Sequence, residues 1–298
     1  MIGELAALGA AICWTVSAVL YKEALLKAKP ISINIVRCVC TSMVLVACLV
    51  VVGKLGILMD LSLYAVVVAC LSGVIGLGLG DTLYLVSLKL IGVARAVPLT
   101  CTYPLFSLLL AVFLQGESIS LPVVFGTVAI VFGIWLVSQQ GKTVSELRKK
   151  VLIMGVACAL ATAVVWAISI DLINTAVTLP EKQSLDHALA VNTVRILAVA
   201  VFLLASAPVI DRKFGFLKMQ RRTLVALISG GIVALALGWF LLTFSFLYIP
   251  QSQAVPISST TPLFATISAM VFLREKVTAK NVAGSVVIVF GIFLIFKL

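Results

Sequence analysis

Two arginines lie inside apolar stretches of the chain, where a charged side chain needs either a role or a route to water. Arg37 and Arg195 each lie a few residues from the end of an apolar run. An arginine near the centre of a membrane helix costs about 2.5–3.5 kcal/mol on insertion scales. If these arginines are functional, each guanidinium would bind a carboxylate or a phosphate. The alternative is that each long side chain reaches water at the nearer end of its helix.

An acid and a phenol occupy a third apolar run. Asp81 follows a glycine-rich stretch, and Tyr84 comes one helical turn later. A carboxylate in such surroundings is protonated, paired with a base, or exposed to a water-filled cavity. Pairing with a nearby base would make Asp81 structural, whereas contact with a proton or a substrate would make it functional. The sequence leaves both interpretations open.

Two tryptophans are each followed, one turn later, by a serine. The pairs are Trp14 with Ser17 and Trp166 with Ser169, and residues at this spacing share a helix face. Such a face could form an aromatic wall with a hydroxyl beside it, which would suit a partly apolar ligand. Helix packing is the simpler alternative. Two further aromatic residues complete the predicted substrate-binding set, Tyr103 and Trp239.

The elements that carry these residues are predicted to be transmembrane helices. The chain has 298 residues, of which 62% are hydrophobic and only 11% are charged. A soluble domain would carry about 25% charge. Runs of about 17 to 25 apolar residues can cross a bilayer as helices. The sequence offers ten, near residues 5–21, 33–52, 64–88, 93–114, 121–138, 151–173, 189–210, 224–247, 254–273 and 281–296.

The chain contains an internal duplication. Residues 96–133 recur without a gap at residues 254–291, so that Pro98 and Pro104 align with Pro256 and Pro262. Shared prolines are informative because they constrain the backbone. We therefore predict a first five-helix repeat over residues 1–140, a basic linker over 141–150 and a second repeat over 151–298.

The distribution of basic residues predicts how the two repeats are oriented. Lysines and arginines gather in the breaks after the first, third, fifth, seventh and ninth helices, and such loops face the cytoplasm. Both termini are therefore predicted to lie outside. An odd number of helices per repeat makes the second repeat antiparallel to the first. The predicted fold class is an all-α integral membrane protein, with two inverted five-helix repeats around a central cavity.

The four aligned prolines are predicted to act as hinges. Pro98, Pro104, Pro256 and Pro262 each remove a backbone hydrogen bond and disturb the helix around them. The freed carbonyls need other donors. Hydroxyls stand nearby in both repeats, at Thr100, Thr102, Ser258, Ser259, Thr260 and Thr261.

The chain resembles the drug/metabolite transporter superfamily and, within it, the EamA-like ten-helix exporters. The resemblance rests on the duplication, on a proline-rich helix followed by Leu-Gln-Gly-Glu117 or Leu-Arg-Glu275, and on closing helices containing Val-Phe-Gly-Ile. It covers nearly the whole chain. It implies a secondary transporter in the cell membrane, with export as the favoured direction. Family members are often drawn with cytoplasmic termini, whereas the charges here place the termini outside.

The predicted function is transport of a small polar or zwitterionic metabolite, for example an amino acid, by alternating access. A lipid or hydrophobic-drug flippase on the same fold is the alternative. An enzyme is not expected, because there is one histidine and no His-Glu-x-x-His motif. No metal or cofactor is expected, and the bases, confined to helix breaks, do not suggest nucleic acid. The expected partners are a small-molecule substrate and the lipid bilayer, with coupling to protons or a counter-substrate, in a monomer or homodimer.

Overall fold

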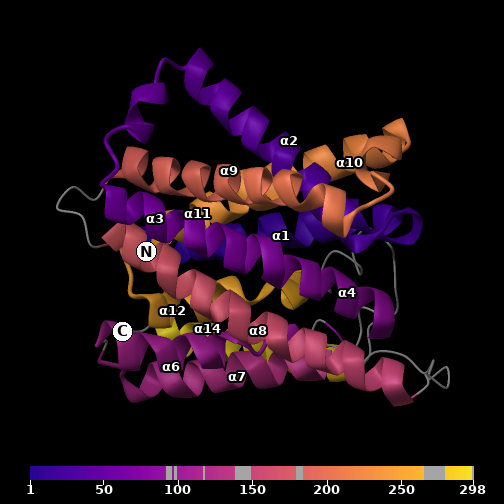
Figure 1. Cartoon of the computed structure of the whole chain (residues 1–298). Coiled ribbons are helices and arrows are strands. Elements are labelled where there is room, and N and C mark those ends of the chain that lie inside the picture. Colours follow the sequence, from indigo (N-terminus) through magenta and orange to yellow (C-terminus); the bar gives the residue numbers. More distant parts are fainter. Residues whose placement is uncertain are drawn as a thin grey trace.

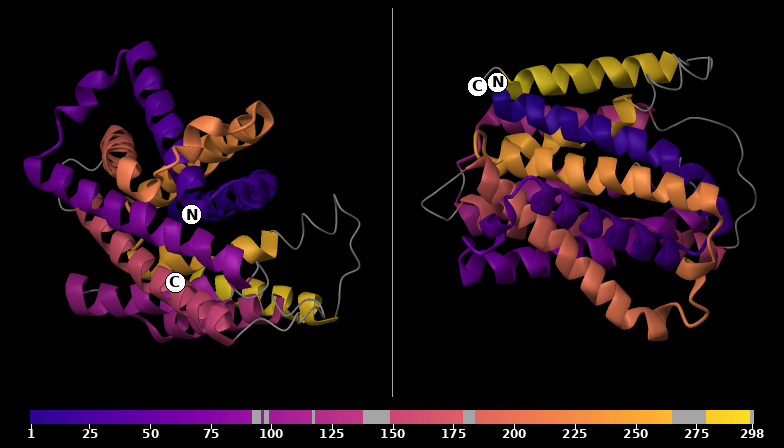
Figure 2. Two further views of the ribbon diagram at one scale, coloured as in Figure 1. Left: turned by 45° about the vertical axis from the view of Figure 1, so that its right-hand side comes forward. Right: turned by 90° about the horizontal axis from the view of Figure 1, so that it is seen from above.

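The structure is a computed structural model of the chain, and it describes residues 1–91, 96, 99–116, 118–137, 149–178, 184–264 and 279–296. Every regular element within these ranges is a helix. The helices lie side by side in a bundle, and the N-terminus and the end of the last helix lie at the same end of it (Figures 1 and 2).

Among the described residues, five helices are long and apolar enough to cross a membrane: Pro30–Val51, Leu63–Ile91, Lys149–Thr178, Leu185–Ile210 and Arg221–Ser245. They comprise α2 (Pro30–Val51), α3 (Leu63–Ser72) with η2 (Gly73–Gly80) and α4 (Asp81–Ile91), α8 (Lys149–Thr178), α9 (Leu185–Ile210), and α10 (Arg221–Gly231) with η4 (Ile232–Gly238) and α11 (Trp239–Ser245). Helices suit these sequences because a helix satisfies its own backbone in lipid.

The remaining described helices overlap the other predicted apolar runs. They are α1 (Ile2–Lys27), α6 (Tyr103–Gln115), α7 (Leu121–Val137), α12 (Gln251–Ser258) and α14 (Ala279–Phe296), with short 3₁₀ turns η1 (Leu55–Leu58) and η3 (Gly215–Lys218) between helices. The predicted runs at 93–114 and 254–273 extend beyond the described ranges. Helix α8 begins at Lys149, inside the segment predicted as a linker, and residues 141–148 lie outside the described part.

The middle of two long helices is π-helical, which the sequence did not predict. In η2 and η4 the backbone makes wider turns than an α-helix, and such segments are rare and frequently functional. An asparagine from a neighbouring helix donates to carbonyls of each. Asn34 on α2 donates to the Leu77 oxygen at 2.7 Å, and Asn192 on α9 donates to the Leu235 oxygen at 3.2 Å. These side chains tie α2 to η2 and α9 to η4.

The chain breaks its helical course next to three of the four prolines predicted as hinges. A turn at residues 101–102 precedes α6, which has Pro104 in its first turn. Pro256 lies inside α12, and a turn at residues 259–260 separates that helix from Pro262. Pro98 lies outside the described residues. Nearby hydroxyls donate to backbone carbonyls three residues earlier: Thr102 to Leu99, Ser258 to Val255, Ser259 to Pro256 and Thr260 to Ile257. None of these acceptors lies four residues before a described proline, so these four bonds do not supply the donors that were predicted for the freed carbonyls.

Glycines allow α7 and α14 to touch backbone to backbone. A Cβ built on Gly126 would lie 2.8 Å from the Gly291 oxygen, and one on Gly133 would lie 2.7 Å from the Gly284 oxygen. The earlier glycine of each helix meets the later glycine of the other, so the two helices are antiparallel. Small residues permit this close approach in membrane helices.

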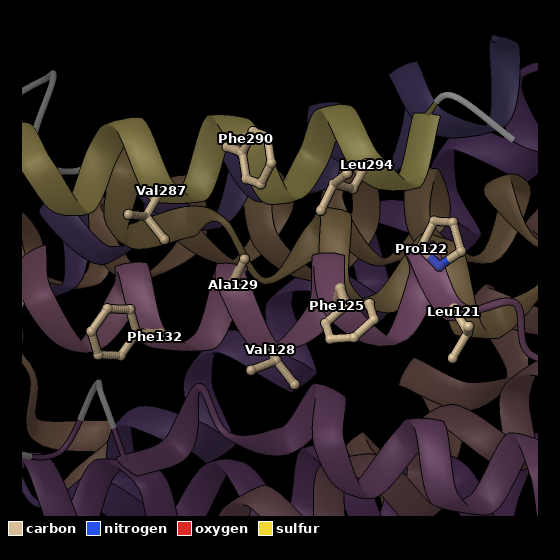
Figure 3. A pocket seen from close by; sticks show the side chains of 9 residues that line it. All are labelled: Leu121, Pro122, Phe125, Val128, Ala129, Phe132, Val287, Phe290 and Leu294. Carbon is tan, nitrogen blue, oxygen red and sulfur yellow. The ribbon is translucent and has the colours of Figure 1, made fainter.

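A groove of about 550 Å³ lies between α7 and α14, and all nine side chains that line it are apolar (Figure 3). They come from only these two helices and include Phe125, Phe132 and Phe290, whose side chains are more than half exposed. None of the predicted site residues lines this groove.

Candidate functional site

Arg37 is buried and paired with Asp81. The guanidinium, on α2, donates through Nη2 to Asp81 Oδ2 at the start of α4, and its Nε donates to Asn34 Oδ1 at 2.9 Å. Arg37 is only 5% exposed. The alternative that this side chain reaches water is therefore wrong for the described conformation. The structure instead bears out the predicted alternative that Asp81 pairs with a base.

Trp166 on α8 joins this pair to several aromatic rings. Its Nε1 donates to the second carboxylate oxygen of Asp81 at 2.8 Å. The rings of Tyr84 and Tyr103 have their centroids 5.1 and 5.9 Å from that of Trp166. We call Arg37, Asp81, Trp166, Tyr84 and Tyr103 the Asp81 cluster. Both oxygens of its carboxylate accept hydrogen bonds, and these come from two different helices.

Arg195 lies in a second cluster with different chemistry. Its Nη2 donates to Ser169 Oγ on α8 at 2.9 Å, and its guanidinium carbon lies 3.7 Å from the ring centroid of Trp239. The ring of Trp239 also meets that of Trp14 on α1, with centroids 5.3 Å apart. We call Arg195, Ser169, Trp239 and Trp14 the Arg195 cluster. Arg195 is 0% exposed, so this arginine does not reach water either.

Two nitrogens of Arg195 lack acceptors. Within the part of the chain that the structure describes, Nε and Nη1 have no hydrogen-bond partner, and no carboxylate forms an ion pair with this arginine. The Oδ1 atom of Asn192, one turn earlier on α9, is also buried without a donor. The second cluster therefore contains a buried cation whose charge the described residues do not neutralise.

The two clusters use matched positions of the repeat. Arg37 aligns with Arg195, and Asp81 aligns with Trp239. In each cluster the arginine packs against the residue at the second position, which is a carboxylate in the first and an indole in the second. An indole face attracts a cation by about 2 kcal/mol when both are desolvated, but it does not accept guanidinium N–H groups as a carboxylate does.

Ser169 is held in position by the last residue of α3, just before η2. Its Oγ donates to the Ser72 carbonyl at 2.8 Å, and Ser72 Oγ donates to the Ser169 carbonyl at 2.7 Å. A Cβ on Gly76 would lie 2.0 Å from Ser169 Oγ and 3.2 Å from Arg195 Nη2. The missing side chain at Gly76 thus makes the room in which the serine and the arginine meet.

The two members of each predicted tryptophan–serine pair bond to different partners. Trp166 belongs to the Asp81 cluster, whereas Ser169 bonds Arg195. Ser17 donates to the Trp14 carbonyl at 2.9 Å within its own helix, and Trp14 Nε1 donates to the Ala234 carbonyl at 3.3 Å. Spacing placed each pair on one helix face, but neighbouring helices then engage the two members separately.

Four polar residues at the clusters were not among the predicted site residues. Asn34 and Asn192 hold the π-helices, Ser72 fixes Ser169, and Ser258 Oγ lies 3.5 Å from the Tyr103 hydroxyl. A signal for the asparagines was present, because they occupy matched positions one turn before the two arginines. Nothing in the sequence distinguishes Ser72 from other serines in apolar runs.

A bundle of apolar helices with arginines and a carboxylate buried among them defines a multi-pass membrane protein of the transporter class. The chain belongs to the EamA-like transporter family, part of the drug/metabolite transporter superfamily, because the family model matches residues 1–139 and again residues 153–297. This confirms the resemblance stated from the sequence. Family membership points to a transporter rather than an enzyme.

Two individual proteins are similar over nearly their whole length. An uncharacterized transporter of Archaeoglobus fulgidus is 26% identical over 295 residues, which cover 99% of this chain and 98% of that protein. A solved structure described as "Crystal structure of protein" superposes with a TM-score of 0.77 at 17% identity, covering 98% of this chain and 95% of the other. At that identity the structural likeness shows a shared fold.

Proposed function

We propose that the protein is a secondary active transporter that moves a small polar or zwitterionic metabolite, for example an amino acid, out of the cell by alternating access. The carrying observation is the pair of buried polar clusters in the middle of an otherwise apolar helical bundle. Buried charges are expensive in a membrane protein, and they commonly mark a substrate or ion pathway. Family membership supports the same class of function.

The proposed architecture is ten transmembrane helices in two inverted five-helix repeats around a central cavity, with repeats over residues 1–140 and 151–298. The family model matches once in each half, which supports the duplication. The crossing of α7 and α14 supports the inversion. Gly126 aligns with Gly284, yet it contacts Gly291, the residue aligned with Gly133. A two-fold axis in the membrane plane produces this exchange of partners.

Contacts between the halves suggest what would separate when the transporter changes its open side. Trp166 in the second half bonds Asp81 in the first, and Trp14 in the first half bonds the Ala234 carbonyl in the second. Rocking of one half against the other would break these links. The helix breaks beside Pro104 and Pro256 lie where the backbone has lost regular hydrogen bonds, which suits them to act as hinges.

A lipid or hydrophobic-drug flippase is the second candidate, and the apolar groove between α7 and α14 favours it. This groove is lined by apolar side chains and would suit an acyl chain. However, no residue of the Asp81 cluster or the Arg195 cluster lines this groove. Lipid translocation by the reconstituted protein, with no transport of polar solutes, would select this candidate.

Transport by proteoliposomes tests the proposed function. Counterflow of labelled amino acids is expected to be saturable in the wild type. Arg195→Ala is expected to lower it at least about tenfold at equal protein content, because this buried cation would contact the substrate. Gly56→Ala serves as the control, since a Cβ there meets nothing within 4 Å and lies far from both clusters in η1. Wild-type uptake by Arg195→Ala would remove Arg195 from the site.

We also propose that both termini lie outside the cell membrane, on the charge distribution. Single cysteines at Ser145→Cys and Gln183→Cys, in a chain whose seven native cysteines have been replaced, test this orientation. A membrane-impermeant thiol reagent added outside is expected to modify position 183 and to leave position 145 unmodified until the membrane is permeabilised. Modification at position 145 alone would reverse the assignment.

A further inference from the structure

The guanidinium of Arg195 is buried with two of its nitrogens unpaired in the described part of the chain. It carries three N–H hydrogens, on Nε and Nη1, for which no acceptor lies within the described ranges. It is also fully buried. Leaving a buried donor without an acceptor costs about 1–3 kcal/mol, and more when the group is charged. This cost would be offset if the unpaired N–H groups bound a ligand.

The first half of the chain shows how the same position is completed elsewhere in this protein. Arg37 has the Asn34 oxygen on Nε and the Asp81 carboxylate on Nη2. Arg195, the matched arginine, makes neither contact. Asn192 Oδ1 accepts no hydrogen bond from the described residues, and the residue aligned with Asp81 is Trp239. Among the described residues, the Arg195 cluster therefore has one carboxylate fewer than the Asp81 cluster.

We propose that Arg195 binds the carboxylate group of a ligand, which takes in the second cluster the role that Asp81 takes in the first. This inference rests on the proposed transport function and adds the chemical class of the substrate. Arginine is suited to the task because its planar fork of donors matches a carboxylate. The guanidinium carbon lies 3.7 Å from the ring centroid of Trp239, so the indole covers one face of the guanidinium.

Neighbouring groups suggest the rest of the ligand. Ser169 accepts one hydrogen bond from Nη2, and its own hydroxyl donates to the Ser72 carbonyl, so the ligand is expected to bind through Nε and Nη1. Asn192 Oδ1, one turn away on the same helix, offers an acceptor. A hydroxyl or amine beside the carboxylate would supply the missing donor. The ligand class is thus a small carboxylate with an adjacent N–H or O–H group.

Thermal-shift titrations of the full-length protein in lipid nanodiscs test the proposal, with sodium propionate, sodium lactate and the neutral isostere propionamide as probes at constant ionic strength. Propionate and lactate are expected to stabilise the wild type in a saturable manner, with lactate the tighter, whereas propionamide gives no shift. Arg195→Gln is expected to weaken both carboxylates at least about tenfold, which corresponds to the loss of one charge-assisted contact. Asn192→Leu is expected to abolish the advantage of lactate.

A matched pair of variants separates a binding role from a structural one while Arg195 stays in place. Trp239→Asp supplies an internal carboxylate at the position aligned with Asp81, so propionate binding is expected to be lost. Trp239→Asn removes the indole in the same way and has nearly the size of the aspartate but no charge, so it is expected to bind propionate more tightly than Trp239→Asp does. Equal propionate affinity in the wild type, Arg195→Gln and Trp239→Asp would overturn the proposal, as would the absence of a saturable response to both carboxylates.

Counterflow measurements keep this inference distinct from the proposed function. Transport of amines or neutral solutes that survives Arg195→Gln, with no carboxylate binding, would overturn the carboxylate site and leave the transporter intact. Saturable carboxylate binding that depends on Arg195, without transport of any solute, would uphold the site and overturn the transport function.

Discussion

Glutamine in place of Arg37 is expected to lower the free energy of unfolding by about 3–5 kcal/mol, whereas the same replacement at Arg195 is expected to change it by about 1 kcal/mol or less, or to raise it. Removing Arg37 leaves the Asp81 carboxylate buried without a counter-ion, which is costly. Removing Arg195 forfeits one hydrogen bond and the contact with Trp239, but it also removes a buried charge that no described carboxylate neutralises.

The midpoint of thermal unfolding in one lipid or detergent mixture, followed by tryptophan fluorescence, measures the difference between the two variants. Asp81→Asn is expected to resemble Arg37→Gln, because it leaves the buried Arg37 guanidinium without a counter-ion. Its NH2 group would also replace one of the two oxygens that accept from Arg37 and Trp166, and an NH2 group cannot accept. The double variant Arg37→Gln/Asp81→Asn should recover part of the loss, since no unpaired charge remains.

Equal destabilisation by Arg37→Gln and Arg195→Gln would show that both arginines serve the fold in the same way. The expected asymmetry has a functional meaning. A residue whose removal leaves stability unchanged or improved, but abolishes transport, is kept for function at a cost in stability. The matched positions make this comparison direct, because each arginine lies on the corresponding helix of its own half.

Alanine in place of Gly73 is expected to destabilise the protein by about 3 kcal/mol or more. The added Cβ would lie 2.2 Å from the backbone oxygen of Arg195, so the start of η2 and helix α9 would have to separate. Backbone atoms of packed helices yield much less easily than the end of a flexible side chain, and overpacking at such contacts is expensive. Separation would also shift Arg195 away from Ser169.

Two glycines provide graded controls for this prediction. Gly231, at the matched position, would place its Cβ 2.5 Å from the Thr41 hydroxyl and 3.1 Å from the Arg37 oxygen, so Gly231→Ala should be milder. Gly56→Ala meets no neighbouring atom and should be neutral or slightly stabilising. The temperature of the unfolding midpoint is expected to be highest for Gly56→Ala, lower for Gly231→Ala and lowest for Gly73→Ala. An unchanged midpoint for Gly73→Ala would contradict the close helix approach.

The long helices could be predicted from the sequence because their cause is local. A run of apolar side chains has to satisfy its backbone internally in lipid, and a helix does so without help from distant residues. The hydrogen bonds of the hydroxyls near Pro256 also have a local cause, since each hydroxyl donates to a carbonyl one turn earlier. The π-helices were not predicted, and the contacts that accompany them are not local: Asn34 and Asn192 donate to their carbonyls from another helix.

By itself, the sequence determined that the chain is an apolar helical protein, that it is duplicated, and that arginines and an acid lie within the apolar runs. Only the tertiary structure decided which side chains meet: Arg37 with Asp81 and Trp166, and Arg195 with Ser169 and Trp239. The physical reason is that these effects act over different distances along the chain. Hydropathy and backbone constraints act within one segment, whereas the pairing of a buried charge depends on how separate helices cross, and the two matched arginines therefore ended in different surroundings.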